Sequence, residues 1–217
     1  MKKFFSLAAM ALFMSLTVNA QIVKSEGKKI ETTYTTTTKT VTTDYKNYNR
    51  IYFGYAPTKM KAKYKGTSDS ETMHGLDFGW TGGYNVTKGK RLPLYIETGF
   101  ALNADFDDGD ILANFEIPVN VTYRYNIGRS KVKVAPYFGF HFKINAYWSD
   151  GDNNYFDYDG TNRVQMGMQL GVNFDLNHFY LGFGWDKDFN PIQKYQYYGD
   201  DVKLSTSGAR LNIGFAF

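Results

Sequence analysis

The stretch "ILANFEIPVNVTYRYNI", residues 111–127, decides the fold because its side chains alternate in character. The odd positions carry Ile, Ala, Phe, Val and Tyr, and the even positions are polar except for Leu112 and Pro118. Successive side chains of a β-strand point to opposite faces, so this period of two predicts one long strand with one apolar face. The fold then depends on what that apolar face contacts.

The same period recurs along the rest of the chain and predicts eight strands. Their alternating apolar positions fall within 51–55, 76–86, 92–106, 111–127, 132–148, 164–176, 179–185 and 209–217. Short connections are expected at 87–91, at 128–130 and around Asn177, and they alternate with long polar loops at 58–72, 105–110, 149–162 and 186–202. This alternation predicts an antiparallel up-and-down sheet with the short turns at one end.

An eight-stranded barrel can turn its apolar face inward around a ligand, as a lipocalin-like barrel does, or outward toward lipid. The apolar side chains here are too many and too large for the narrow lumen of eight strands. The opposite face carries most of the strand glycines, which suit a crowded interior. The sequence therefore predicts an all-β fold, an eight-stranded antiparallel up-and-down transmembrane β-barrel. Aromatic residues near the strand ends are expected to form the interfacial girdles: Tyr84, Tyr123, Tyr125, Trp148, Trp185, Phe215 and Phe217.

The first twenty residues have the three parts of a secretory signal peptide. Lys2 and Lys3 precede the apolar run "FFSLAAMALFMSLTV", which ends at the small-residue site Val18-Asn19-Ala20. We expect residues 1–20 to be removed on export, residues 21–48 to form a Thr-rich periplasmic segment, and residues 49–217 to form the barrel. A retained membrane helix, or a plug or added strand within 21–48, is the alternative.

The charge and the absence of cysteine exclude several classes of partner and site. The formal net charge is +4, and loss of Lys2 and Lys3 with the signal peptide leaves +2, too weak to indicate a nucleic-acid partner. A chain without cysteine has no disulfide, no thiolate metal site and no catalytic thiol.

With these features the chain resembles the small outer-membrane β-barrels of Gram-negative bacteria, similar in plan to OmpX and to the membrane domain of OmpA. The shared features are the signal peptide, the eight strands, the alternating connections and the end "RLNIGFAF" with Phe217. The resemblance implies a place in the cell outer membrane, contact with its lipid, and recognition of Phe217 by the barrel-assembly machinery. The Thr-rich segment "ETTYTTTTKTVTTDYKNYN" departs from the simplest members of this group.

Few residues in the sequence indicate a catalytic or metal-binding site. The only imidazoles are His74, His141 and His178; no Ser, His and acid grouping is evident, and the histidine and serine motif of lipid-A deacylases of similar architecture is missing. The segment "DGDNNYFDYDG" (150–160) has oxygen ligands at its first, third and fifth positions, but it lacks the sixth-position glycine and twelfth-position glutamate of a calcium loop. We therefore expect no catalytic, metal or cofactor site.

The preferred function is a structural or surface-interaction barrel, acting in envelope integrity or adhesion through acidic, Tyr-rich extracellular loops that meet an unknown partner. The alternative is a small porin that passes solutes, and a lipid-modifying enzyme is less favoured. Eight strands leave little free lumen, which favours the first of these.

An inward polar network is expected to block a wide pore. Counting residues across the turn at 128–129 places Glu116 opposite His141, with Lys143 diagonal to it. Charges in a narrow interior must either pair with one another or stay hydrated. The alternative to a paired network is therefore a set of polar side chains that are only hydrated. The predicted network consists of Asp77, Glu97, Glu116, His141, Lys143 and Arg210.

A basic patch is expected on the outer wall. The odd parity of the first strand continues through "TKMKAKYKG", so its lysines would face outward just above the hydrocarbon, next to the last strand. Ammonium groups at that height suit lipopolysaccharide phosphates, and the alternative is a solvated edge without a ligand. The predicted patch consists of Lys59, Lys61, Lys63, Lys187, Lys203 and His74.

Overall fold

The computed structural model describes residues 45–87, 92–127, 131–149, 151 and 153–217. All of them belong to one compact unit, Val41–Phe217. The predicted signal peptide and nearly all of the Thr-rich segment lie outside the described residues, as do most of the expected turns at 87–91 and 128–130. Within the described ranges, no helix is long and apolar enough to cross a membrane.

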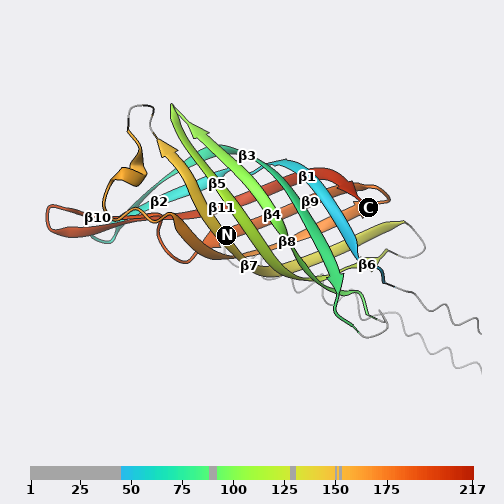
Figure 1. Cartoon of the computed structure of the whole chain (residues 1–217). Helices are drawn as coiled ribbons and strands as arrows, with labels where there is room; N and C mark the ends of the chain where they lie inside the picture. The colour runs from blue at the N-terminus through green and yellow to red at the C-terminus, as the bar shows by residue number, and fades with distance from the viewer. Residues whose placement is uncertain (1–44, 88–91, 128–130, 150, 152) are drawn as a thin grey trace, which may run out of the picture. The chain divides into compact units, whose positions relative to one another are not determined.

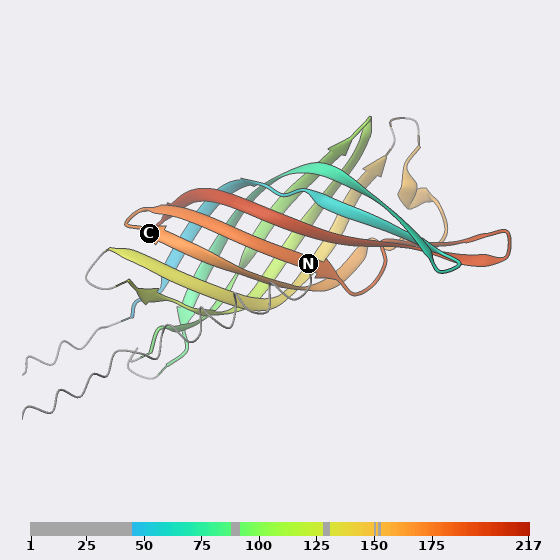
Figure 2. The same cartoon turned by 180° about the vertical axis from the view of Figure 1, so that it is seen from behind.

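The strands form one antiparallel ring (Figure 1 and Figure 2). They are β1 (Tyr48–Tyr55), β2 (Thr58–Tyr64), β3 (Thr67–Asn85), β4 (Leu94–Asp107), β5 (Asp110–Tyr123), β6 (Tyr125–Asn126), β7 (Val132–Ser149), β8 (Val164–Leu176), β9 (Phe179–Asp188), β10 (Gln193–Tyr197) and β11 (Asp200–Ala216). β2, β6 and β10 continue the paths of β1, β5 and β9, and β11 closes the ring by pairing with both β9 and β1. The predicted eight-stranded all-β barrel is confirmed.

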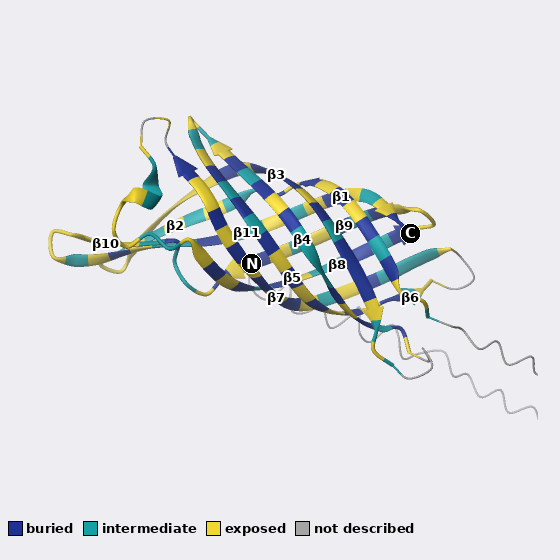
Figure 3. Cartoon of the chain, viewed as in Figure 1, coloured by how far each residue is buried: buried dark blue, intermediate teal, exposed yellow. Residues whose placement is uncertain are grey.

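The apolar face of the strands points outward, as predicted. Phe53 and Ile213 expose 52% and 59% of their surface, whereas the alternating positions are buried and mostly polar or glycine. Figure 3 shows this alternation of exposed and buried residues along each strand of the ring. An apolar exterior around a polar interior suits hydrocarbon rather than water, so the ring has the surface of a membrane-spanning barrel.

Three of the four expected long loops are extensions of the strands, so their assignment as loops was wrong, whereas the odd parity expected to continue through 58–65 is present in β2. β2 joins β3, β4 joins β5 and β10 joins β11 through two-residue turns at Lys65-Gly66, Asp108-Gly109 and Tyr198-Gly199. Both residues of each turn have positive φ, from 39° to 98°, the conformation of the tightest hairpin turns, in which glycine is favoured. Of the fourth expected loop, the described residues 153–163 lie outside the long strands and contain the short helix η2 (Tyr155–Asp157).

Four of these strand segments form a sheet that extends beyond the ring, which we call the projecting sheet. β10 pairs with the first part of β11, which pairs with β2, which pairs with the first part of β3. Figure 1 and Figure 2 show these segments reaching past the other strands at one end of the barrel. Pro57 separates β1 from β2, yet its carbonyl still accepts a hydrogen bond of 3.2 Å from the Ala209 amide, so the wall is continuous.

A β-bulge turns Trp148 inward, which corrects its predicted place in the aromatic girdle. Ala113 pairs with Tyr147 and Asn114 pairs with Asn145, so Ala146 is an extra residue in β7. The extra residue reverses the parity of the strand end, and Trp148 is only 4% exposed. It belongs to a cluster that we call the apolar cap, which lies on the side of the polar interior that faces the projecting sheet. The cap consists of Met73, Leu112, Trp148 and Ile192, with Met60, Tyr155, Phe156 and Leu204 packed against them. The cap explains why Leu112 interrupts the polar face of its strand.

The register between β5 and β7 differs by two residues from the predicted one. Glu116 lies opposite Lys143, and His141 lies opposite Pro118. The pairing of Asn126 with Lys133 shows that this hairpin is centred one residue later than the prediction assumed. Glu116 therefore has Lys143 as its direct cross-strand neighbour and His141 as its diagonal one.

Candidate functional site

The structure places all six predicted network residues on the inner face of the barrel, but five of them belong to two separate clusters and Asp77 belongs to neither. Glu97 belongs to a cluster near the short-turn end. Glu116, His141, Lys143 and Arg210 belong to a cluster in the middle of the barrel. Each cluster also contains charged residues that the sequence analysis did not select.

The short-turn cluster is built around Arg50, which is fully buried. Arg50 Nε donates to Asp175 Oδ1 at 3.0 Å, and its other end pairs with Glu97. Arg124 Nε donates to the second oxygen of Asp175 at 2.6 Å, and the Tyr48 hydroxyl donates to Glu97 Oε2 at 2.7 Å. Two arginines thus neutralise two carboxylates, and the hydrogen bonds fix all four side chains.

The central cluster joins strands from both sides of the lumen. Lys143 Nζ lies 3.6 Å from Asp186 Oδ2 and 3.2 Å from Asp188 Oδ2. Arg210 Nε donates to Asp186 Oδ1 at 3.2 Å, and a second nitrogen of Arg210 donates to Glu116. Because these contacts run from β5 and β7 across to β9 and β11, the side chains cross the lumen rather than line it.

Asp77 takes a separate place on the inner wall. Its Oδ1 lies 3.0 Å from the amide nitrogen of Asn212, in the orientation of that amide that satisfies both groups. Its Oδ2 has no hydrogen-bond partner among the described residues. Asp77 therefore faces the interior as predicted, but it forms no ion pair with the central cluster within the described part of the chain.

One group in the described residues has the spacing of metal ligands. Ligand atoms of His141, Asp186 and Asp188 lie within 4.8 Å of one another, and His141 Nε2 is 2.6 Å from Asp188 Oδ1. Lys143 contacts both carboxylates, and Arg210 contacts Asp186. These cations supply the positive charge that a metal would otherwise bring, so the group fits an ion-pair network better than a metal centre.

The lumen holds very little free space at this level. The cavity between the two clusters has a volume of about 30 Å³, room for very few water molecules, and Tyr52, Pro118, Tyr137 and Arg210 are among its walls. The apolar cap closes the barrel above the central cluster. Together they leave no wide path through the described part of the barrel.

The predicted basic patch lies on the outward face of the projecting sheet and the adjoining wall. Lys59, Lys61 and Lys63 alternate outward along β2, and Lys203 on β11 pairs directly with Lys63. Lys187 on β9 reaches the same face, since it and Lys59 both pair with Ser207. His74 faces outward on β3, where its Nδ1 lies 2.6 Å from the Tyr55 hydroxyl.

The sequence analysis missed a seventh member of this patch, Lys194. It pairs with Lys203 across β10 and β11, so lysines from three adjacent strands, Lys63, Lys203 and Lys194, lie side by side. All three are exposed, and none of them forms an ion pair within the described residues. Lys194 was missed because strand parity was followed as far as Lys187 and again at Lys203, but not through the segment between them.

The inner side of the projecting sheet carries the opposite charge. Asp69 and Glu71 alternate with the outward residues of β3 and line a cavity of about 530 Å³ above the apolar cap. The negative charge of Asp107 is the main reason that the pKa of Glu71 is raised. The sheet is therefore basic toward the outside of the barrel and acidic toward its mouth.

Comparison with known proteins gives distant matches to solved structures. No family model and no curated protein matches the chain. Ail, the attachment invasion locus protein of Yersinia pestis, shares 13% identity over 79% of this chain and 99% of its own, with a TM-score of 0.42. Neisserial surface protein A shares 15% identity over 77% and 97%, with a TM-score of 0.43. The outer membrane protein OprG from Pseudomonas aeruginosa shares 13% over 79% and 95%, with a TM-score of 0.38.

The fold itself, an eight-stranded antiparallel up-and-down barrel with an apolar outer surface, follows from the strand pairing and burial of this chain. At these identities and TM-scores the comparisons carry no argument about function. The features of this chain that bear on function are its charged interior, its apolar cap and its projecting sheet.

Proposed function

We propose that this protein is an outer-membrane barrel that anchors the projecting sheet at the cell surface as an interaction surface and does not act as a general pore. The observation that carries this proposal is the continuity of strands: β2, β3 and β11 run from a sealed, lipid-facing ring into a polar sheet. A barrel whose interior is filled by ion pairs has its remaining functional surface outside the membrane. Export through a cleaved signal peptide and assembly through Phe217 belong to the same proposal.

Conductance in a planar bilayer tests the first part. We expect the purified full-length protein to show no steady channel, because the central cluster and the apolar cap both cross the lumen. A porin of known conductance in the same bilayer is the positive control. Large, steady single-channel steps from this protein would favour the small-porin alternative instead.

We further propose that the outward lysines of the projecting sheet bind lipopolysaccharide. Lys59, Lys61 and Lys63 point to the side of the barrel, where the outer leaflet would surround the base of the sheet, and Lys203 and Lys194 extend the same face. Several ammonium groups on a rigid sheet can engage several phosphates at once. Hydroxyl groups of Ser205 and Ser207 lie between the lysines on the same face and can accept or donate further hydrogen bonds.

A matched pair of double variants tests this binding. Lys61→Gln with Lys63→Gln removes two charges from the patch, and Lys131→Gln with Arg163→Gln removes two charges from exposed positions outside it. We expect the first variant to bind lipopolysaccharide about tenfold more weakly and to lose part of its thermal protection by it, since each charged hydrogen bond contributes about 1.5–3 kcal/mol before solvent screening. The second variant should behave as the unchanged protein does. Equal binding and equal melting of both variants would exclude the patch as the binding surface.

A further inference from the structure

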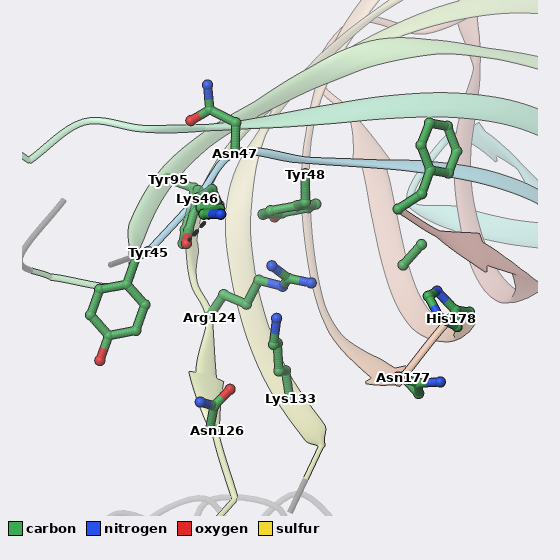
Figure 4. Close-up of a pocket in the computed structure, with 12 residues that line it drawn as sticks. Tyr45, Lys46, Asn47, Tyr48, Tyr95, Arg124, Asn126, Lys133, Asn177 and His178 are labelled. Atoms are coloured by element: carbon green, nitrogen blue, oxygen red, sulfur yellow. Dashed lines mark hydrogen bonds between the residues drawn. The ribbon is translucent and has the colours of Figure 1, made fainter. Parts of the chain in front are cut away.

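A cavity opens at the short-turn end of the barrel, far along the strands from the projecting sheet (Figure 4). Its volume is about 300 Å³, within the range of small-ligand sites. The residues that matter for its chemistry are Lys46, Tyr48, Arg124, Lys133 and His178, which come from the start of β1, the β5–β6 junction, β7 and the turn between β8 and β9. Four of the five are basic.

Arg124 is held in one orientation at the inner wall of this cavity. It is 8% exposed, its Nε donates to Asp175, and its guanidinium carbon lies 4.0 Å from the centre of the Tyr48 ring. An arginine fixed by a carboxylate on one side and an aromatic ring on another loses little further freedom when it binds a ligand.

Lys133 brings a second positive charge to the same place. Figure 4 shows its ammonium group and the guanidinium of Arg124 pointing into the same part of the cavity. Asp175 lies directly across from Lys133 in the β7–β8 pairing, but its two oxygens accept from Arg50 and Arg124. Within the described residues no ion pair reaches Lys133.

The described short-turn end therefore carries more positive than negative charge. Arg50, Arg124 and Lys133 face Glu97 and Asp175, and Lys46 adds a fourth cation at the cavity mouth. Like charges drawn together inside a barrel wall repel each other unless an anion or water lies between them. This excess of positive charge at the short-turn end contrasts with the acidic inner side of the projecting sheet at the other end.

We propose that this cavity binds a carboxylate or phosphate group between Arg124 and Lys133. The planar guanidinium supplies paired donors, the ammonium group supplies a mobile point charge, and His178 at the rim can add a donor. Because both cations face the lumen and not the lipid, the ligand is a soluble anion rather than a membrane headgroup. The remaining volume leaves room for an organic group attached to that anion.

Titration of the full-length protein in a non-ionic, phosphate-free detergent tests the site. Inorganic phosphate and citrate serve as probes, followed by the ³¹P line width of phosphate and by calorimetry for citrate. Lys133→Gln should weaken binding of both probes by about tenfold or more, because it removes one charge-assisted hydrogen bond. Lys133→Arg, which keeps the charge, should restore most of it.

The control is Lys131→Gln, which removes the same charge from an exposed position two residues away and outside the cavity. It should change the affinity by less than about twofold. Strand content of every variant is checked by circular dichroism, so that loss of binding is not loss of the fold. The proposal is overturned if the Lys131 and Lys133 variants bind alike, if neither probe binds the unchanged protein, or if only vesicles of anionic phospholipid bind.

Discussion

At the scale of single residues, strand parity determines whether a side chain meets lipid or the interior, and one inserted residue is enough to reverse it. Trp80 and Trp185 follow the regular alternation and lie on the outer face, where Trp185 is 38% exposed. Trp148 follows the extra residue Ala146 and is buried in the apolar cap, with its ring centre 4.3 Å from that of Tyr155. The three tryptophans of the chain thus occupy two environments, the outer face of the barrel and the apolar cap inside it.

Quenching by brominated lipid distinguishes these environments. We expect a variant that keeps only Trp80, or only Trp185, to lose much of its fluorescence in brominated vesicles, because bromine atoms on the acyl chains contact the outer wall. A variant that keeps only Trp148 should lose little. Strong quenching of Trp148 would contradict both the bulge and the cap, and soluble acrylamide serves as the control for access from water.

Parity also explains which interior residues the sequence could reveal. Glu97, Glu116, His141 and Lys143 lie on regular strand positions, where alternation indicates an inward direction, and all four are buried. Arg50 and Asp175 carry the same signal and were simply not selected. Asp186 and Asp188 flank Lys187, whose outward direction was predicted, so the same alternation places both of them inward, although neither was selected. The pairing of each charge across the lumen is a three-dimensional relation that no local pattern contains.

At the scale of elements, the projecting sheet replaces flexible loops with paired strands. Of the three turn dipeptides, only Asp108-Gly109 is a recognised hairpin signal, and weighing it would have predicted one tight hairpin in place of a loop. Lys65-Gly66 and Tyr198-Gly199 supply the favourable glycine but place an unusual residue at the first positive φ. The polar composition of these segments was misleading because strands that leave the lipid no longer need an apolar face. The polar composition of a segment indicates that it lies in water. The residues at its turn indicate whether the backbone folds back as a hairpin.

The position of the sheet gives a topological prediction. An epitope inserted after Gly66 or at Gln196 should be reached by antibody on intact cells, because both sites lie at the far end of strands that leave the ring. An epitope at Asn177, in the two-residue turn between β8 and β9, should be reached only after the outer membrane is permeabilised. The reverse pattern would mean that the barrel is inserted with its short turns outside.

At the scale of the whole molecule, two different barriers cross the lumen one above the other. The central cluster is held by ion pairs, and the apolar cap is held by packing of Leu112, Trp148 and Ile192. Because the barriers share no side chain, either one is expected to block ions without the other.

Removing the barriers singly and together tests this expectation. Trp148→Ala with Ile192→Ala opens the cap. Glu116→Ala with Arg210→Ala removes both members of one ion pair and leaves Asp186 with Lys143 as its partner. We expect each double variant to conduct as little as the unchanged protein, and the fourfold variant to show steady conductance. A current from either double variant alone would mean that a single barrier seals the barrel.

The paired strands of the projecting sheet also restrict how such a protein can change its length over evolution. β2 and β3 meet residue for residue from Thr58–Met73 to Tyr64–Thr67, and their faces differ in charge. Insertion of one residue into β2 would turn every lysine beyond it toward the acidic mouth of the barrel. Insertions within the paired segments keep both the register and the two charged faces only in steps of two residues on both strands at once. Related chains should therefore differ there by multiples of four residues, and single-residue gaps should collect at the turns and at bulges such as Ala146.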